Sequence, residues 1–160
     1  MQFTVSAGEN QPASSANVSR VLFLAIAVLA VAGIVVSAIS LQRHYAKSAS
    51  AFCDIGEKFN CDIVNRSEYS SVMGIPVAGI GIAGYGVLLI LATLYRTRTD
   101  TPTWVAAAAI AGLSFALYLT YVEGYVLGTW CILCLSSLGM IAGIAVLAGV
   151  VRARAASLRG

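Results

Sequence analysis

The sequence predicts an all-α, polytopic membrane protein, a bundle of four transmembrane helices with one long extracytoplasmic loop after the first helix. Hydrophobic residues make up 59% of the 160 residues and charged residues only 11%, whereas soluble domains have about 25% charged residues. Four stretches carry no Asp, Glu, Lys or Arg, and each is close to the roughly 20 residues that a membrane-spanning helix needs. None of them alternates as a strand would, and lipid tolerates only helices or closed barrels, so we expect helices.

The four expected helices are Val21–Leu41, Ile75–Tyr95, Trp104–Val122 and Trp130–Val151. A polar loop of residues 42–74 joins the first two, and short turns at 96–103 and 123–129 join the others. We expect residues 1–20 to be a disordered tail and residues 152–160 a basic tail. The first apolar run is longer than the 7–15-residue core of a signal peptide and follows a mostly polar segment, which favours an uncleaved anchor.

The positions of lysine and arginine predict the orientation, because short cytoplasmic segments carry an excess of them. One side would hold Arg20, Arg96, Arg98, Arg152, Arg154 and Arg159, and the other Arg43, Lys47, Lys58 and Arg66, all four in the long loop. Long loops translocate largely regardless of charge. We therefore expect an inner-membrane (cytoplasmic-membrane) protein with both termini in the cytoplasm. The arginines near the inner face account for most of the net charge of +3, so the charge gives no reason to expect nucleic acid as a partner.

The four cysteines form two pairs, Cys53 and Cys61 in the long loop and Cys131 and Cys134 at the start of the fourth helix. With four crossings, the long loop and the last turn must lie on the same side of the membrane. All four cysteines are therefore expected near the extracytoplasmic face, a compartment in which disulfides persist. Two pairs of thiols in that compartment suggest two disulfides.

Each pair has a structural interpretation beside the redox one. A Cys53–Cys61 disulfide could staple the loop, and Cys131 and Cys134 could be inert buried thiols, since a free cysteine packs like a small hydrophobic residue. A zinc site made of all four is disfavoured, because the spacing in the loop is unlike that of common zinc motifs and His44 is the only histidine. We therefore expect no metal.

The Cys131-Ile-Leu-Cys134 motif fits thiol chemistry better, because it places both sulfurs on one face at the start of a helix. A helix N-terminus favours the thiolate, which is the attacking species in disulfide exchange. A dithiol also needs an electron acceptor, and the sequence has no dinucleotide-binding, haem-attachment or iron–sulfur motif. A lipid-soluble two-electron acceptor such as a quinone is compatible with a dithiol in apolar surroundings.

Several motifs, in this order, resemble the vitamin K epoxide reductase family and specifically its bacterial homologues. They are Ala51-Phe-Cys-Asp-Ile-Gly56, Cys61, Ser67, Gly74-Ile-Pro76 and Cys131-Ile-Leu-Cys134, within about residues 20–151. The resemblance implies a four-helix bundle around a quinone, either menaquinone or ubiquinone, with the loop folded over the pocket. In the other type of quinone-linked disulfide oxidase the Cys-x-x-Cys pair comes first, and here the order is reversed.

The same resemblance implies roles for individual residues. Cys53 and Cys61 match the pair that exchanges disulfides with a partner, Cys131 and Cys134 match the catalytic pair, and Ser67 and Cys134 lie next to the quinone. Because many bacterial relatives carry a fused thioredoxin-like domain and this chain ends shortly after the fourth helix, the expected partner is a separate thioredoxin-fold thiol oxidase of the DsbA type. Ser67 has an alternative interpretation as the N-cap of a short segment, 68–73.

The predicted function is therefore that of a quinone-dependent thiol–disulfide oxidoreductase that drives disulfide formation in exported proteins. Two alternatives stay open at this point, a non-catalytic membrane assembly factor with structural disulfides and a vitamin K epoxide or quinone reductase in the narrow sense. A conduit that carries electrons outward from a cytoplasmic thiol is disfavoured, because four crossings leave no cysteine near the inner face.

Overall fold

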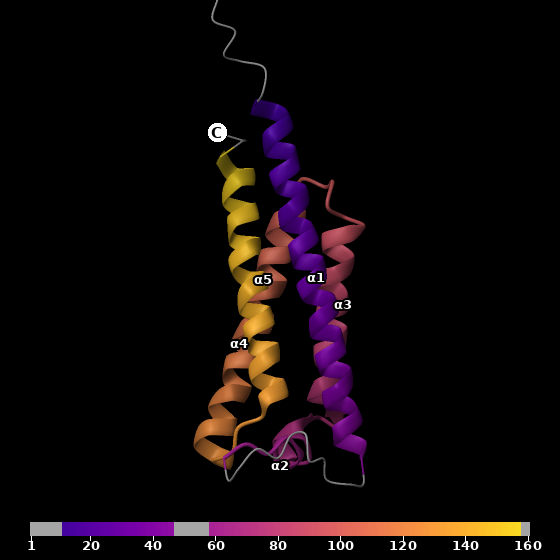
Figure 1. Ribbon diagram of the computed structural model, residues 1–160, viewed down its shortest axis with the longest axis vertical. Helices are drawn as coiled ribbons and strands as arrows, with labels where there is room; N and C mark the ends of the chain where they lie inside the picture. The colour runs from indigo at the N-terminus through magenta and orange to yellow at the C-terminus, as the bar shows by residue number, and fades with distance from the viewer. Residues whose placement is uncertain (1–10, 47–57, 158–160) are drawn as a thin grey trace, which may run out of the picture.

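The structure, a computed structural model, describes residues 11–46 and 58–157, with side chains from residue 16 onward in the first helix. Most of this chain is helical, and four long helices lie side by side with the short elements at one end (Figure 1). The order is α1 (Gln11–Tyr45), α2 (Cys61–Asn65), the 3₁₀ turn η1 (Glu68–Ser70), β1 (Ser71–Val72), β2 (Ile75–Pro76), α3 (Val77–Thr93), α4 (Thr101–Tyr121), the π-helix η2 (Val122–Leu127) and α5 (Ile132–Ser157). The predicted all-α class is confirmed.

α1 extends beyond both of its predicted ends, and α5 extends beyond its predicted C-terminal end. We predicted a disordered tail over residues 1–20, but α1 runs from Gln11 to Tyr45, so the prediction is wrong for residues 11–20. Residues 1–10 lie outside the described part of the chain. The only proline near this end, Pro12, lies in the first turn, where its missing N–H costs little. α5 continues to Ser157, into the predicted basic tail. The length of an apolar stretch predicts which part of a helix can cross lipid. It does not predict where the helix ends, and here the helices continue into the polar flanks.

α3 is shorter than predicted because a small hairpin precedes it. Ile75 pairs with Val72 and Pro76 with Ser71 in an antiparallel register. The turn between the strands has positive φ at Met73 (53°) and at Gly74 (81°), as a tight hairpin requires. The helix therefore begins at Val77 instead of Ile75 and ends at Thr93 instead of Tyr95.

The predicted turn at 123–129 is largely helical. α4 starts at Thr101, three residues before the predicted Trp104, and the chain continues from Tyr121 directly into η2. η2 ends at Gly128, whose φ of 62° lies in the left-handed region, where glycine carries no steric penalty. Single-turn π-helices of this kind are rare and occur frequently at functional sites.

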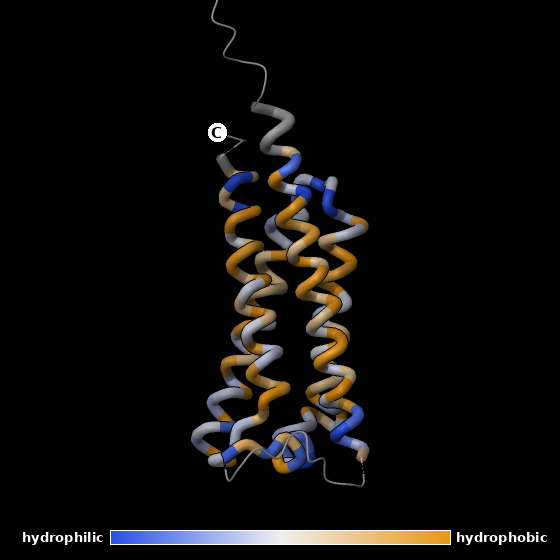
Figure 2. Tube along the Cα trace, in the orientation of Figure 1, coloured by the Kyte–Doolittle hydropathy of each residue, from blue (hydrophilic) through white to orange (hydrophobic). Residues whose placement is uncertain are grey.

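The long helices pack around an apolar core. α1 contacts α3 and α5, and α4 contacts α5 and, less extensively, α3. The buried side chains are mostly aliphatic or alanine, with Phe23 and Tyr85 as the aromatic members: Phe23, Ile26, Ala27, Ala30, Tyr85, Leu88, Ala92, Val105, Ala106, Ala109, Ile141, Ile144, Ala148 and Val151. Many large apolar side chains are also exposed, as expected where the surrounding medium is lipid. Figure 2 shows that hydrophobic residues run along most of the length of the long helices.

Three spans of the described chain are long and apolar enough to cross a membrane: Ala16–Tyr45, Thr101–Leu127 and Ile132–Ser157. A fourth apolar helix, Val77–Thr93, is shorter. The composition of these helices is that of a membrane protein, and a crossing by α3 stays a prediction.

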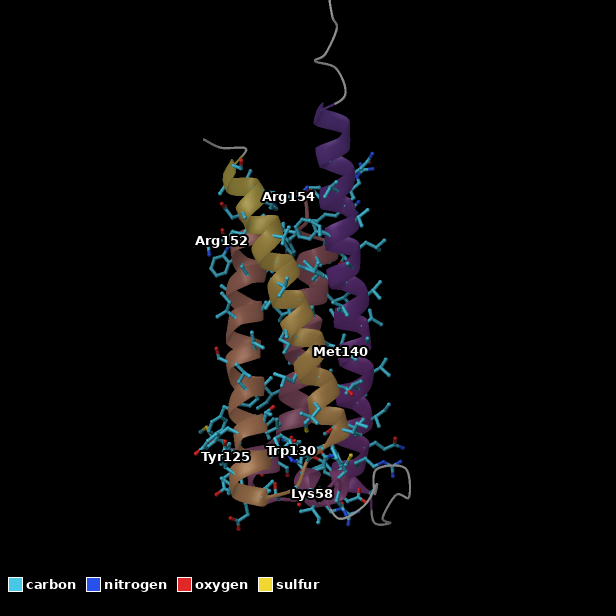
Figure 3. The ribbon with its side chains drawn as sticks, turned by 60° about the vertical axis from the view of Figure 1, so that its left-hand side comes forward. Lys58, Tyr125, Trp130, Met140, Arg152 and Arg154 are labelled. Carbon is cyan, nitrogen blue, oxygen red and sulfur yellow. The ribbon has the colours of Figure 1, made fainter. Side chains whose placement is uncertain are left out.

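The two ends of the helices differ in what they carry. The start of α1 and the end of α5, with Arg152 and Arg154, lie at one end, and Lys58, Tyr125 and Trp130 lie at the other (Figures 1 and 3). α2 packs at this second end, so the short elements and the first turn of α5 form one site.

Candidate redox site

Two short backbone segments hold the loop against the start of α5. Phe59 and Trp130 form a parallel β-bridge. The Asn60 N–H donates to the Trp130 carbonyl oxygen at 3.1 Å, and the Trp130 N–H donates to the Lys58 carbonyl oxygen at 2.9 Å. Figure 3 shows Lys58 and Trp130 together at this end of the molecule. Because Cys61 and Cys131 each directly follow a bridged segment, the bridge brings the two cysteines together.

Asn60 also starts the helix that carries Cys61. Its side-chain oxygen accepts hydrogen bonds from the N–H groups of Asp62 and Ile63, each at 3.1 Å, as an N-cap side chain does. α2 then turns Cys61 and Val64 inward, where they pack with Cys131 and Leu133. The local sequence thus helps to position Cys61 beside Cys131.

Cys131 lies between the other two described cysteines. Its side chain is fully buried and interacts with the thiols of both Cys134 and Cys61. The hydrogen bond with the Cys134 thiol is the main cause that lowers the pKa of the Cys131 thiol, against the opposing effect of burial. A lowered pKa makes Cys131 the better nucleophile of a buried pair. Cys53, the fourth predicted cysteine, lies outside the described residues.

Asn65 joins this group of cysteines to α1. The Asn65 amide nitrogen donates to the Cys131 sulfur at 4.0 Å, and its side-chain oxygen accepts from the Ser40 hydroxyl at 2.6 Å. The His44 Nδ1 lies 2.5 Å from the Asn65 carbonyl oxygen, and a carbonyl can only accept, so this nitrogen carries the proton. α2 is therefore held by the end of α1 as well as by α5.

A cavity of about 320 Å³ opens beside these cysteines. Cys134 lines it, whereas Cys61 and Cys131 do not. Its walls are mostly apolar, and the polar groups are concentrated near the loop, with His44, Asn65 and Ser67, and deeper between the helices, with Tyr85 and Ser137. Small-molecule sites commonly combine an apolar lining with a few placed polar groups and reach such volumes.

Ser67 lies at the mouth of this cavity. It precedes η1 at the N-cap position, but its side chain makes no cap hydrogen bond. Its hydroxyl instead donates to the Val64 carbonyl oxygen at 2.8 Å. The structure therefore gives no support to the capping interpretation, and the contact of Ser67 with a quinone stays a prediction.

Tyr85 reaches across the bundle from α3 to α5. Its hydroxyl donates to the Ser137 carbonyl oxygen at 2.8 Å and lies 2.9 Å from the Ser137 hydroxyl. The ring packs directly against Gly33 of α1, where a Cβ atom would come within 2.4 Å of it. A glycine at this position is what lets the ring fill the space between the helices.

Glu123 is the unexpected member of the site. It lies in η2, is only 2% exposed and lines the cavity beside Cys134. Its Oε2 accepts a hydrogen bond from the Cys131 N–H at 3.1 Å, and the carboxyl group also interacts with the Cys134 thiol. The sequence analysis treated Glu123 only as the start of a turn. A signal was present, since it is the only acidic residue after Asp100, and ionisable residues inside membrane proteins are usually functional.

Asn65 and Tyr85 were missed for a different reason. Both are common residue types in unremarkable surroundings, and their importance comes from contacts with distant segments, Cys131 for one and Ser137 for the other. Nothing in the local sequence indicates such contacts.

The described residues contain no group of three or more His, Cys, Asp or Glu side chains that could hold a metal ion.

An apolar helical protein with a buried Cys-x-x-Cys motif beside an apolar cavity has the features of a membrane thiol oxidoreductase. The pattern that defines the vitamin K epoxide reductase family matches residues 24–149, which is most of the chain. The chain belongs to this family of oxidoreductases. Ser67 and all four cysteines lie within the matched range.

Proposed function

We propose that the protein oxidises the dithiol of a separate thioredoxin-fold partner and reduces a membrane quinone, menaquinone or ubiquinone, and so drives disulfide formation in exported proteins. The observation that carries this proposal is the order of the sulfurs. Cys134 lines the cavity, Cys131 is buried behind it, and Cys61 contacts Cys131 from the loop. This order leads from the loop to the cavity.

Three exchanges balance the reaction. The partner dithiol reduces the Cys53–Cys61 disulfide, with Cys53 the sulfur attacked, and becomes a disulfide itself. The freed Cys61 attacks Cys131, the Cys131–Cys134 bond breaks, and Cys53 then restores the loop disulfide, so that Cys131 and Cys134 hold the two electrons. The helix dithiol gives two electrons to the quinone and closes again, its two thiol protons are released, and the quinone takes up two protons. The net result is one disulfide in the partner and one quinol.

The cavity is compatible with a quinone head group. Its volume of about 320 Å³ and its apolar walls suit a flat, mostly apolar ring. Ser67 and Cys134 both line it, in agreement with the roles expected for them. A quinone bound there would accept electrons, and the chain would supply the thiol that delivers them and the polar groups that orient the ring carbonyls.

We further propose that the cysteine end of the bundle faces the extracytoplasmic side of the inner membrane. A thiol reagent that cannot cross membranes should then label reduced Cys53 from outside intact cells. As a control, a cysteine introduced by Arg98→Cys, in the exposed turn after α3, should react only after the cells are permeabilised. The reverse pattern would show that the orientation is opposite.

Quinol formation tests the function directly. Detergent-solubilised protein, a short-chain quinone and a reduced thioredoxin-fold protein should together produce one quinol for each dithiol oxidised, measured by the change in quinone absorbance. Dithiothreitol can replace the protein substrate when the partner is not at hand. Absence of quinol with folded wild-type protein and with both quinone types would overturn the proposed function.

Two variants sharpen this assay. Cys134→Ser should abolish quinol formation, because the sulfur that lines the cavity is replaced by a hydroxyl group, which cannot form a disulfide with Cys131. Ser67→Ala should raise the KM for the quinone with little change in melting temperature, since its hydroxyl makes no cap hydrogen bond. Full activity of Cys134→Ser would favour the alternative of an assembly factor whose cysteines are structural.

A further inference from the structure

Glu123 has an arrangement that packing alone does not explain. Its carboxyl group is almost fully buried, and only Oε2 has a hydrogen-bond partner of good geometry, the Cys131 N–H. Oε1 is buried and makes no such hydrogen bond with any described residue. Buried polar atoms in native proteins are nearly always satisfied, and an exception calls for a specific explanation. An apolar residue at this position would fill the same space without leaving an oxygen unpartnered.

The position of Glu123 relates it to the dithiol and to the cavity at once. Its carboxyl group holds the backbone of Cys131, interacts with the Cys134 thiol and lines the same cavity as Cys134. η2 directs the side chain there, and the turn that follows is held by the Thr129 N–H, which donates to the Glu123 carbonyl oxygen at 3.2 Å. The carboxyl group therefore lies where a proton would have to pass between the thiol and a molecule in the cavity.

We propose that Glu123 transfers the proton between the Cys134 thiol and the quinone. This inference rests on the proposed function. When the helix dithiol is oxidised, Glu123 takes the proton of the Cys134 thiol, the Cys131–Cys134 bond forms, and two electrons pass to the quinone. Glu123 then gives its proton to one quinone oxygen. The Cys131 proton leaves to water at the loop end, and the second quinone oxygen takes up a proton from water, so that Glu123 returns to its starting state.

Few other titratable groups are available for this task. The other titratable groups that line the cavity are His44 from α1, Tyr69 from η1 and Tyr85 from α3, while Cys61 from α2 and Cys131 before α5 lie behind it. The Tyr69 side chain is 47% exposed, so it lies partly in solvent. α4 contributes only apolar residues and a glycine to the lining. The His44 Nδ1 interacts with the Asn65 carbonyl oxygen, and the Tyr85 hydroxyl donates to the Ser137 carbonyl oxygen. Glu123, in contrast, has one carboxylate oxygen, Oε1, that has no hydrogen-bond partner among the described residues.

Glu123→Gln is the informative variant, because glutamine keeps an oxygen for the Cys131 N–H but cannot carry the proton. It should lower quinol formation about 100-fold, the usual size of a general acid–base contribution, and remove the pH dependence that Glu123 imposes. Glu68→Gln, the same change at an exposed site outside the cavity, should have no effect. Glu123→Asp should recover part of the lost activity, since it restores an ionisable group.

A second measurement needs no quinone. In the reduced protein, alkylation of Cys134 by iodoacetamide, followed across pH by peptide mass spectrometry, should lose in Glu123→Gln the step that the ionisation of Glu123 imposes, and its rate profile should become that of a simple thiol. Wild-type protein that alkylates as described but forms no quinol would count against the proposed function and leave the proton acceptor in place. Unchanged alkylation and unchanged quinol formation in a folded Glu123→Gln variant would overturn the inference. If Glu123→Gln fails to fold, a folded Glu123→Leu variant, which cannot carry a proton, with wild-type quinol formation would also overturn it.

Discussion

Replacement of Cys134 by alanine is expected to stop quinol formation and to trap the loop on the fourth long helix through a Cys61–Cys131 disulfide. Cys131 is fully buried between Cys61 and Cys134, so it can bond either of them. Without Cys134, the thiol that competes with Cys61 for Cys131 is gone. The mixed disulfide should therefore accumulate when the partner or a mild oxidant is supplied.

Cys131→Ala is the matched control for this trapping. It should also form no quinol, because the connection between the loop and the cavity is lost, but the loop pair can still exchange with the partner and nothing joins the loop to α5. Non-reducing peptide mapping distinguishes the two variants directly. Appreciable quinol formation by Cys134→Ala, or a trapped Cys53–Cys131 link, would contradict the assigned order of the sulfurs.

Gly33→Ala should destabilise the helix bundle even though alanine is the better helix former. A Cβ atom at this position would lie 2.4–2.6 Å from the Tyr85 ring, too close for a real contact, and the ring is buried between α1 and α3. Overpacking of this kind usually costs about 1–3 kcal/mol. The displaced ring would also lose the hydrogen bonds of its hydroxyl to Ser137.

Thermal or denaturant unfolding in detergent measures this effect. Gly86→Ala in α3 provides the control, because a Cβ atom there meets nothing within 4 Å, and its stability should be unchanged or slightly raised by the gain in helix propensity. The double variant Gly33→Ala with Tyr85→Leu should recover part of the loss. Equal stabilities of Gly33→Ala and Gly86→Ala would show that the ring moves aside at no cost.

The parts of the fold that follow from apolar length were predictable, and those that follow from local backbone geometry were not. The four long helices appear where uncharged stretches of about 20 residues occur. The hairpin at 71–76 and the π-helix at 122–127 depend on φ values at Met73, Gly74 and Gly128, for which a hydropathy pattern carries no information. These two features decide where α3 begins and where Glu123 lies.

The site divides in a similar way. Cys131 and Cys134 are three residues apart, and this spacing alone predicts that their side chains lie close together. The family resemblance predicted that Cys61 exchanges with this pair. The sequence could not reveal that Lys58, Asn60 and Trp130 hold the loop by backbone hydrogen bonds, since any residues except proline can form them. Asn65 and Glu123 contact Cys131 through their side chains, and the local sequence does not indicate these contacts either.

The bridge between Phe59 and Trp130 also limits how far the first cysteine of the loop can travel. Lys58 is held to Trp130, and Cys53 is only five residues before it, so the covalent chain allows Cys53 at most about 18 Å from that anchor, at up to about 3.6 Å per residue. Although the loop predicted between the first two long helices (42–74) has 33 residues, Cys53 can therefore move only a short distance from Trp130. In the proposed reaction, a thiol partner would have to bring its own reactive sulfur within this radius, and a bulky domain could do so only by contacting the end of the helices where α2 lies.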